Sequence, residues 1–309
     1  MTLTRPTHLA LFVMAALAAF TVTGSGAART AARQAAPVPP PPLVVSQHAR
    51  AVAPGEAVLL TFKAPGGIAA VRGTAFGAPF VGFAGDSPDT WHALIGIDLA
   101  TKPGRSLVEI EARMADGSPL RAGYPLTVAP KTFSTRRLSV APAFVTPPAS
   151  EQARIERERA LLARVLAGVS PRRLWGDGIA RPTNGEAISQ FGVRSVFNGQ
   201  PRSQHRGVDF RGATGTPVSA PAAGLVVFAD DLYFAGTTVI LDHGLGVFSM
   251  LCHLSRVDVR QGAVVARGDM IGAIGATGRV TGPHLHWTLR IGPASVDPLS
   301  VLSVVGLPR

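Results

Sequence analysis

Histidines crowd one part of this 309-residue chain, in a pattern that suits metal chemistry. Five of the eight histidines lie between positions 205 and 286, and an aspartate, Asp209, follows the first of them at a spacing of four. Two imidazoles and a carboxylate are the ligand set of a catalytic zinc site, in which a fourth position stays open for water. Because zinc makes such water a nucleophile near neutral pH, the pattern indicates a hydrolase. The group comprises His205, Asp209, His243, His253, His284 and His286.

A closed structural zinc site is another use of such residues, and the cysteine content argues against it. Structural sites take four protein ligands, usually thiolates, whereas Cys252 is the single cysteine of the chain. No internal disulfide can form, so stability has to come from packing. We expect Cys252 to be a small buried residue on the face of its strand opposite His253.

The closely spaced residues of the group are expected to share a face of a β-sheet. An even spacing in an extended chain puts two side chains on the same side. His205 and Asp209 are four apart around Gly207, which favours a loop running into a strand. His284 and His286 are two apart, so both imidazoles should face the same side.

The neighbours of these residues are expected in the core. Leu285 and Trp287 alternate with the histidines and should point inward. A further strand, expected over 247–253, ends at His253 with Leu251 on the same face. His243 lies in a turn between two expected strands, where a structural role or a place on the rim of the site is expected.

Three segments of this region closely resemble the lysostaphin-type zinc endopeptidases, or LytM-type domains. They are residues 204–210, 251–255 and 275–287, within a resemblance that covers about 185–300. It implies hydrolysis of peptide bonds in bacterial peptidoglycan, with one zinc ion per chain. It also implies that the zinc ligands are His205, Asp209 and His286. The two catalytic histidines implied by the resemblance are His253 and His284.

One position departs from that family. The residue two before the first catalytic histidine is often tyrosine there, and here it is Leu251. A hydroxyl near the cleft is then missing, which affects contacts with substrate and not the metal site. His48 and His92, in the N-terminal half, are isolated, so a surface or packing role is expected for both.

Two other functions stay open. A non-haem iron oxygenase also uses two histidines and a carboxylate, although its first histidine and carboxylate usually stand one residue apart. A catalytically silent LytM-type domain would bind the cell wall or activate another hydrolase. Such regulators typically lose a ligand, and all five positions are present here. For His253 and His284 the alternative to proton transfer is a supporting role that only holds the ligands.

The expected fold class is mostly β. Short β-like runs with frequent turn signals follow residue 43 and are typical of a β-sandwich. A connector helix is expected over 150–168, with Ser150 as its N-cap, Gly168 at its end and a charged, solvated face. From residue 187 onward dense strand-like runs, without helical periodicity, predict an antiparallel sheet.

Five segments follow from these patterns. The N-terminal apolar run is too short to span a bilayer comfortably and precedes small residues, as in a secretory signal peptide. No later segment is apolar enough to cross a membrane. The segments are 1–28 (signal peptide), 29–42 (Ala/Pro-rich linker), 43–145 (β-sandwich-like accessory domain), 146–170 (connector helix) and 171–309 (zinc metallopeptidase domain, motif core 185–300).

Charge and composition limit the partners. The net charge is +11, which in an exported protein suggests anionic polymers of the cell envelope beside the peptide stems of peptidoglycan. Codon usage is the alternative origin of the arginines. Nucleic acid is not expected, because aromatic residues make up only 6% and no basic helix is present. The expected location is periplasmic or extracellular.

Overall fold

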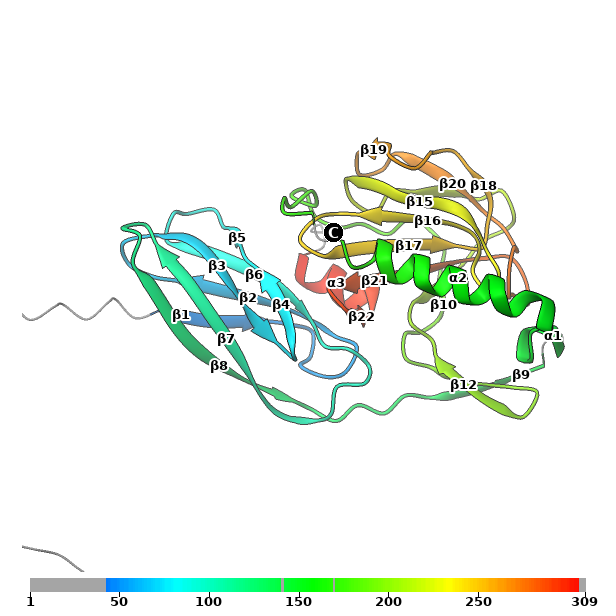
Figure 1. Ribbon diagram of the computed structural model, residues 1–309, viewed down its shortest axis with the longest axis horizontal. Helices are drawn as coiled ribbons and strands as arrows, with labels where there is room; N and C mark the ends of the chain where they lie inside the picture. Colours follow the sequence, from blue (N-terminus) through cyan, green and yellow to red (C-terminus); the bar gives the residue numbers. More distant parts are fainter. Residues whose placement is uncertain (1–42, 140–141, 169, 306–309) are drawn as a thin grey trace, which may run out of the picture. The chain divides into compact units, whose positions relative to one another are not determined.

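Strands dominate this computed structural model, which describes residues 43–139, 142–168 and 170–305 (Figure 1). The expected signal peptide and linker, residues 1–42, lie outside the described residues. All described residues belong to one compact unit, Pro40–Arg309. In the described part of the chain, no helix is long and apolar enough to cross a membrane. The mostly β prediction is confirmed.

The N-terminal half contains two four-stranded antiparallel sheets, ordered β1-β2-β6-β5 and β4-β3-β7-β8. In β7, buried Val108 and Ile110 alternate with Glu109 and Glu111, so that one face of the strand joins the core. The strands are β1 (Val44–His48), β2 (Ala57–Lys63), β3 (Ile68–Ala75), β4 (Ala78–Val81), β5 (Phe83–Ala84), β6 (Thr90–Gly96), β7 (Gly104–Met114) and β8 (Pro119–Val128).

The expected connector helix is present as α2 (Ala149–Val165), after a short α1 (Pro142–Val145). Its ends differ from the prediction. Pro148 occupies the N-cap position without a side-chain hydrogen bond, and Leu166 is the C-cap. Ser150 is therefore not the cap, because proline's fixed backbone lets the cap lie two residues earlier, at Pro148. The helix also ends before Gly168.

One face of α2 packs on the C-terminal sheet. Leu162 and Val165 contact an apolar cluster that includes Phe228 and Phe248. The charged face is only partly solvated, contrary to the prediction. Arg154 pairs with Glu158 at 2.7 Å and with Asp231 at 2.8 Å. Glu158 also accepts a hydrogen bond from the Tyr233 amide, so these charges attach the helix to the sheet.

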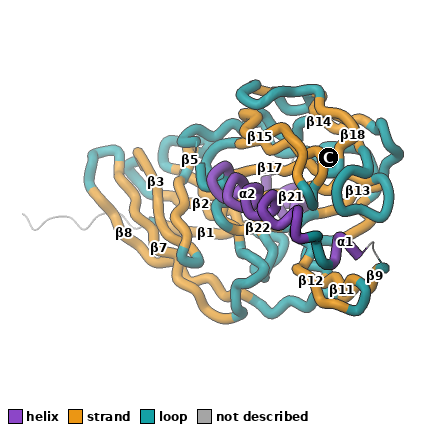
Figure 2. The backbone as a smooth tube through the Cα atoms, turned by 45° about the vertical axis from the view of Figure 1, so that its right-hand side comes forward, coloured by secondary structure: helices purple, strands orange, loops and turns teal. Residues whose placement is uncertain are grey.

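The C-terminal half packs two antiparallel sheets against each other, seen from another side in Figure 2. The larger runs β10-β13-β21-β17-β16-β15-β19, with β22 beside β21, and the smaller runs β14-β20-β18. Their strands are β10 (Ala187–Ser189), β13 (Val208–Arg211), β14 (Pro217–Ser219), β15 (Gly224–Leu232), β16 (Gly236–Asp242), β17 (Val247–Cys252), β18 (Leu254–Val257), β19 (Val264–Val265), β20 (Met270–Ile274), β21 (His284–Ile291) and β22 (Ala294–Val296).

These strands are followed by a helix that the sequence pattern did not predict. Helix α3 (Pro298–Val305) begins after Asp297, whose carboxylate accepts a hydrogen bond from the Leu299 amide. Asp before Pro is a helix-start signal, because Asp caps and Pro fits the first turn. The helix is almost wholly apolar, which hid its periodicity.

A third small sheet joins distant parts of the chain. It is ordered β12-β11-β9, with β9 (Thr135–Leu138), β11 (Arg194–Phe197) and β12 (Gln200–Gln204). Strand β9 precedes α2 and runs parallel to β11, with Arg136 opposite Ser195. A parallel pair needs a long crossover, which α2 supplies here. The segment before the helix is thereby brought beside the region of the histidines.

Candidate metal centre

Two neighbouring strands of the large sheet carry three of the chemical side chains. Strand β13 pairs antiparallel with β21, so that Asp209 lies opposite His286 and Arg211 opposite His284. Residues directly opposite on neighbouring strands point to the same face. Leu285 and Trp287 alternate with the histidines and are fully buried, as predicted.

His205 reaches the same place from the loop between β12 and β13. Its backbone is fixed by two hydrogen bonds, to the Val193 carbonyl and from the Gly192 amide. Gly207 then lets the loop pass directly over His286. A Cβ atom at Gly207 would lie 2.6 Å from His286 Cε1, a distance that real contacts do not allow. The glycine is therefore needed for this close approach.

Three donor atoms converge at this point. His205 Nε2 lies 3.0 Å from Asp209 Oδ1, His286 Nδ1 lies 2.9 Å from the same oxygen, and the two nitrogens are 3.0 Å apart. The three side chains form a group that could hold a metal ion. The edge of a zinc tetrahedron is about 3.3 Å for bonds of about 2.0 Å. The observed triangle is close to that size.

The hydrogen bonds behind the two imidazoles also fit a cation. His205 Nδ1 donates to the Gln190 carbonyl at 2.9 Å, which leaves Nε2 without a hydrogen in the neutral ring. His286 Nε2 lies 2.9 Å from the Thr288 hydroxyl, which can accept its hydrogen and free Nδ1. Two lone pairs and an anionic oxygen then face one another, an arrangement that a metal ion stabilises.

His253 and His284 lie beside this triangle. The His284 ring is 4.9 Å from that of His253, and His284 Nε2 is 3.7 Å from Asp209 Oδ1. Backbone carbonyls accept from Nδ1 of both rings, Thr277 for His253 and Gly282 for His284. In the neutral rings Nε2 is therefore the free nitrogen, and it is able to accept a proton.

Burial determines the charge states of the group. Burial, followed by the nearby rings of His286 and His284, lowers the pKa of His253 to about 3. Burial also lowers the pKa of His286, although its close contact with the Asp209 carboxylate opposes this. Burial raises the pKa of Asp209, but the close contacts with the His205 and His286 rings outweigh it and hold that pKa well below its usual range. Neutral imidazoles and an ionised carboxylate are the forms that bind metals.

The faces of β17 differ from the prediction. Leu251 lies opposite Trp287 and is fully buried in the core, whereas Cys252 lies opposite His286 and lines the cleft. The strand ends at Cys252, and His253 follows with a φ of 63°. This left-handed conformation breaks the alternation that placed Leu251 with His253. The change from tyrosine to Leu251 therefore removes nothing from the cleft.

Cys252 is buried, as expected, but on the cleft side. Burial raises the pKa of its thiol to about 12. Its sulfur is not among the donor atoms that converge in the group that could hold a metal ion.

The remaining histidines stand apart from the group. His243 is fully buried between the Ala223 carbonyl and the Ser249 hydroxyl, each 2.9 Å away, so its role is structural. His92 packs on the Phe83 ring, and His48 is exposed. Neither reaches the group.

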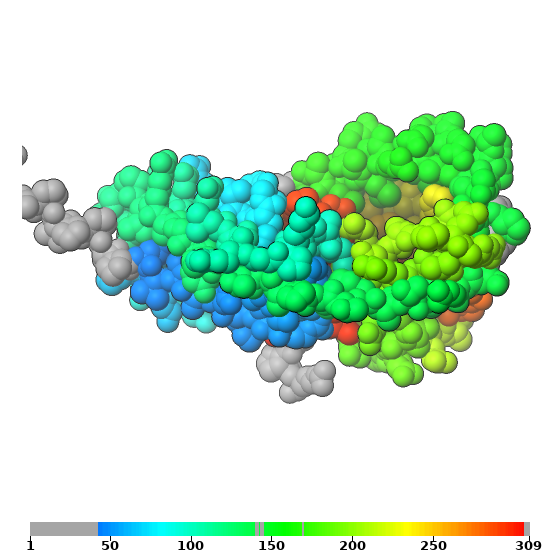
Figure 3. Space-filling model, turned by 90° about the horizontal axis from the view of Figure 1, so that it is seen from below, coloured from blue at the N-terminus to red at the C-terminus, as the bar shows by residue number. Residues whose placement is uncertain are grey.

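The five side chains form the floor of a cleft of about 410 Å³. In Figure 3 the surface is hollowed beside the yellow-green β11–β12 hairpin. The walls include residues that no sequence pattern singled out, among them Arg136, Arg202 and Phe234. Arg136 could not be found from sequence, because only the pairing of β9 with β11 brings it to the cleft.

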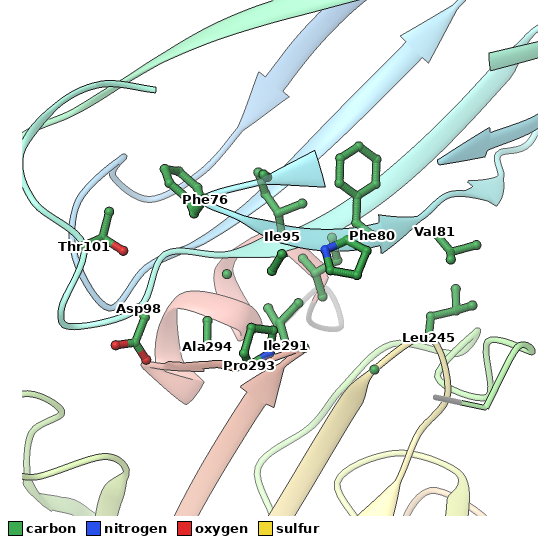
Figure 4. A pocket seen from close by; sticks show the side chains of 17 residues that line it. Phe76, Phe80, Val81, Ile95, Asp98, Thr101, Leu245, Ile291, Pro293 and Ala294 are labelled. Atoms are coloured by element: carbon green, nitrogen blue, oxygen red, sulfur yellow. The ribbon is translucent and has the colours of Figure 1, made fainter. Parts of the chain in front are cut away.

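A second cavity, of about 390 Å³, has a different character (Figure 4). Phe80, Ile95 and Ile291 line it, with Asp98 and Thr101 at its border. It contains no imidazole, so it is not a second candidate for metal chemistry.

Known proteins are similar to the part of the chain that carries this site. Residues 203–298 match peptidase family M23. DD-carboxypeptidase/endopeptidase Mpg of Neisseria meningitidis is 42% identical over 97 residues, and peptidoglycan DD-endopeptidase ShyA of Vibrio cholerae is 45% identical over 95. Each match covers 31% of this chain but only 22% of the relative.

A solved structure matches over a longer stretch. A Pseudomonas aeruginosa chain assigned to peptidase M23 is 33% identical, with a TM-score of 0.64. The match covers 83% of this chain and 96% of that one, so it extends well beyond the histidine-rich region. Together with the family match at the site itself, this similarity shows that the chain belongs to peptidase family M23.

Proposed function

We propose that this chain is a zinc-dependent endopeptidase that hydrolyses peptide bonds in peptidoglycan cross-links. The convergence of five side chains on the floor of one cleft carries the proposal. The activities of two relatives support the substrate, because ShyA is a peptidoglycan DD-endopeptidase and Mpg a DD-carboxypeptidase/endopeptidase.

The proposed zinc ligands are His205 Nε2, Asp209 Oδ1 and His286 Nδ1. When bound, zinc would polarise the scissile carbonyl and make water acidic enough to attack it near neutral pH. Three protein ligands leave a position open for these groups. A buried carboxylate beside two neutral rings gives the site one negative charge, which suits a divalent cation.

His284 and His253 are the proposed catalytic residues. His284 Nε2 lies nearer Asp209 and is assigned to orienting the attacking water and accepting its proton. His253 is assigned to the transition state, where its Nε2, once it has taken up a proton from the attacking water, would stabilise the oxyanion or help return that proton to the leaving amine. In the alternative, both rings only hold the ligands in place.

The proposal extends to the organisation of the chain. Residues 1–28 would direct export and be removed, 29–42 would be a linker, and 43–145 an accessory domain. Residues 146–170 would connect this domain to the peptidase domain of residues 171–309. The proposed location is the periplasm or the extracellular envelope, where peptidoglycan is accessible.

Digestion of purified peptidoglycan tests the function. We expect release of cross-link peptides by the wild-type chain, inhibition by a chelator and restoration by zinc. His286→Ala should lose both bound metal and activity. His284→Ala should keep the metal but lose about 10² to 10⁴-fold in rate. Unchanged cell-wall activity in His286→Ala would favour a non-catalytic regulator, and iron content with oxygen-dependent turnover would favour an oxygenase.

A further inference from the structure

Arginines dominate the charge of the cleft walls. Arg136, Arg202, Arg206 and Arg279 line the cleft, and among its described lining residues Asp209 carries the single carboxylate. That carboxylate faces the two imidazoles at the floor. Arg206 is paired with Asp98, which lies outside this lining, at 3.1 Å. The walls still hold the positive charge of Arg136 and Arg202, whose contacts are to neutral oxygens.

Two of these arginines have a buried donor without a partner. The Nε atoms of Arg136 and Arg202 are buried and make no hydrogen bond in the described part of the chain. Buried donors are normally satisfied, so each such group needs an explanation. Four side-chain atoms are in this state among the described residues, and two of them line this one cleft.

Other contacts hold both guanidinium groups in place. Arg202 Nη2 donates to the Val145 carbonyl and to Gln200 Oε1, each at 2.7 Å. Arg136 Nη1 lies 3.4 Å from the Ser189 hydroxyl. Elsewhere arginines are paired with carboxylates, as Arg154 is with Asp231. The two cleft arginines are thus positioned by neutral groups, and their charge stays available.

The same contacts place Arg136 close to the metal site. The Ser189 hydroxyl that it approaches lies 3.4 Å from His205 Nδ1. One serine therefore separates the guanidinium from a proposed zinc ligand. Arg137, the residue that follows Arg136 in β9, is exposed and does not line the cleft.

We propose that Arg136 and Arg202 form a subsite for a carboxylate of the peptide substrate, beside the metal site. A guanidinium and a carboxylate form a strong charge-assisted pair, and among the described residues the contacts of both guanidinium groups are to neutral oxygens only. The chain then selects peptides with a free carboxylate near the scissile bond. Because β9 precedes α2, the segment before the helix supplies part of the specificity. The inference rests on the proposed endopeptidase function.

Two matched substrates and three full-length proteins test the subsite. The substrates are a cross-linked stem-peptide dimer with free carboxylates and the same dimer with its carboxylates amidated. The proteins are wild type, Arg136→Gln and, as control, Arg137→Gln. We expect wild type and control to prefer the acid by about tenfold or more in kcat/KM. Arg136→Gln should lose most of this preference through a raised KM for the acid.

The outcomes separate this inference from the proposed function. An equal preference for the acid in wild type and Arg136→Gln would overturn the subsite and leave the endopeptidase standing. Hydrolysis of neither dimer would contradict the endopeptidase itself. In that case, calorimetry measures how tightly both dimers bind to the same proteins, and it tests whether the subsite exists without requiring turnover. Tighter binding of the acid, lost in Arg136→Gln alone, supports it, and equal binding of acid and amide overturns it.

Discussion

The chemistry of the site depends on which nitrogen of each imidazole is free. Backbone carbonyls accept from Nδ1 of His205, His253 and His284 and leave Nε2 toward the site. His286 is reversed, because its Nε2 meets the Thr288 hydroxyl and its Nδ1 faces Asp209. The neighbours of each ring thus fix its tautomer, and with it the role that the ring can take.

Gly207 gives a prediction at this scale. In Gly207→Ala the new methyl group would meet His286 Cε1 and the Trp287 carbonyl oxygen, each 2.6 Å from the ideal Cβ position. Because the ring must move, we expect zinc affinity to fall about 10- to 100-fold, as when a ligand loses its orientation. Titration with a competing chelator measures it.

Gly176→Ala is the matched control. The nearest atom to a Cβ atom there is Arg173 Nη2, at 3.8 Å. The control should bind zinc like wild type. Wild-type affinity in Gly207→Ala would show that the loop is not held against His286.

At the scale of elements, the alternation of inward and outward side chains along a strand could be predicted from the sequence. Which strands pair with one another could not. The pattern around His284 and His286 fixed which side chains face outward, because successive strand residues alternate. Nothing local indicates that β13 pairs with β21, so Asp209 could be joined to His286 only through family resemblance. The left-handed backbone at His253 broke the alternation, since φ is not readable from such a pattern.

Contacts between distant segments explain the other features that were not predicted from the sequence. Strand β9 lines the cleft only because α2 separates it from its partner β11. Helix α3 was missed because its apolar residues show no periodic contrast, although Asp297 and Pro298 mark its start. The sequence carries local preferences, and these features depend on contacts between segments far apart in the chain.

The β16–β17 hairpin gives a prediction about pH. Burial lowers the pKa of His243 between these strands to about 4, from an ordinary 6.5. Below pH 6.5 this histidine therefore binds a proton in the unfolded chain that it does not bind in the folded chain. Stability from this group is complete above pH 6.5 and is lost as pH falls toward 4. The loss should reach roughly 2 to 3 kcal/mol by pH 4.5.

Urea denaturation at pH 7 and pH 4.5 measures this term. His243→Gln does not titrate, so its stability should fall less between the two pH values than that of wild type. His48→Gln, at an exposed position, should behave as wild type. An equal fall in His243→Gln and wild type would exclude His243 as the source.

At the scale of the whole molecule, a buried ionic cluster joins the start of β2 to the C-terminal helix. Glu56, with its side chain 3% exposed, binds Arg50 at 2.8 Å and Lys131 at 2.6 Å. Arg50 also binds Asp297 at 2.6 Å. The apolar core beneath β21 continues into β2 at Ala57. The N-terminal strands therefore contribute to the stability of the part that carries the site.

Glu56→Ala tests this coupling. Removing the carboxylate leaves Arg50 and Lys131 without their shared partner, and breaking such a buried pair costs about 3 kcal/mol in the free energy of unfolding. Glu111, which pairs with Arg72 at an exposed position, is the control, and Glu111→Ala should leave the free energy of unfolding almost unchanged. Denaturant unfolding compares the two. Equal losses would mean that the cluster does not couple these elements.

Zinc titration of the metal-free chain tests the central claim most directly. Cleavage of a cross-linked stem-peptide dimer is followed while zinc is added to a known amount of protein. We predict no cleavage without metal, a linear rise and a plateau at one zinc per chain. His286→Ala should stay inactive throughout. Full cleavage by the metal-free chain, or by His286→Ala, would contradict the claim that His205, Asp209 and His286 hold the ion that drives hydrolysis.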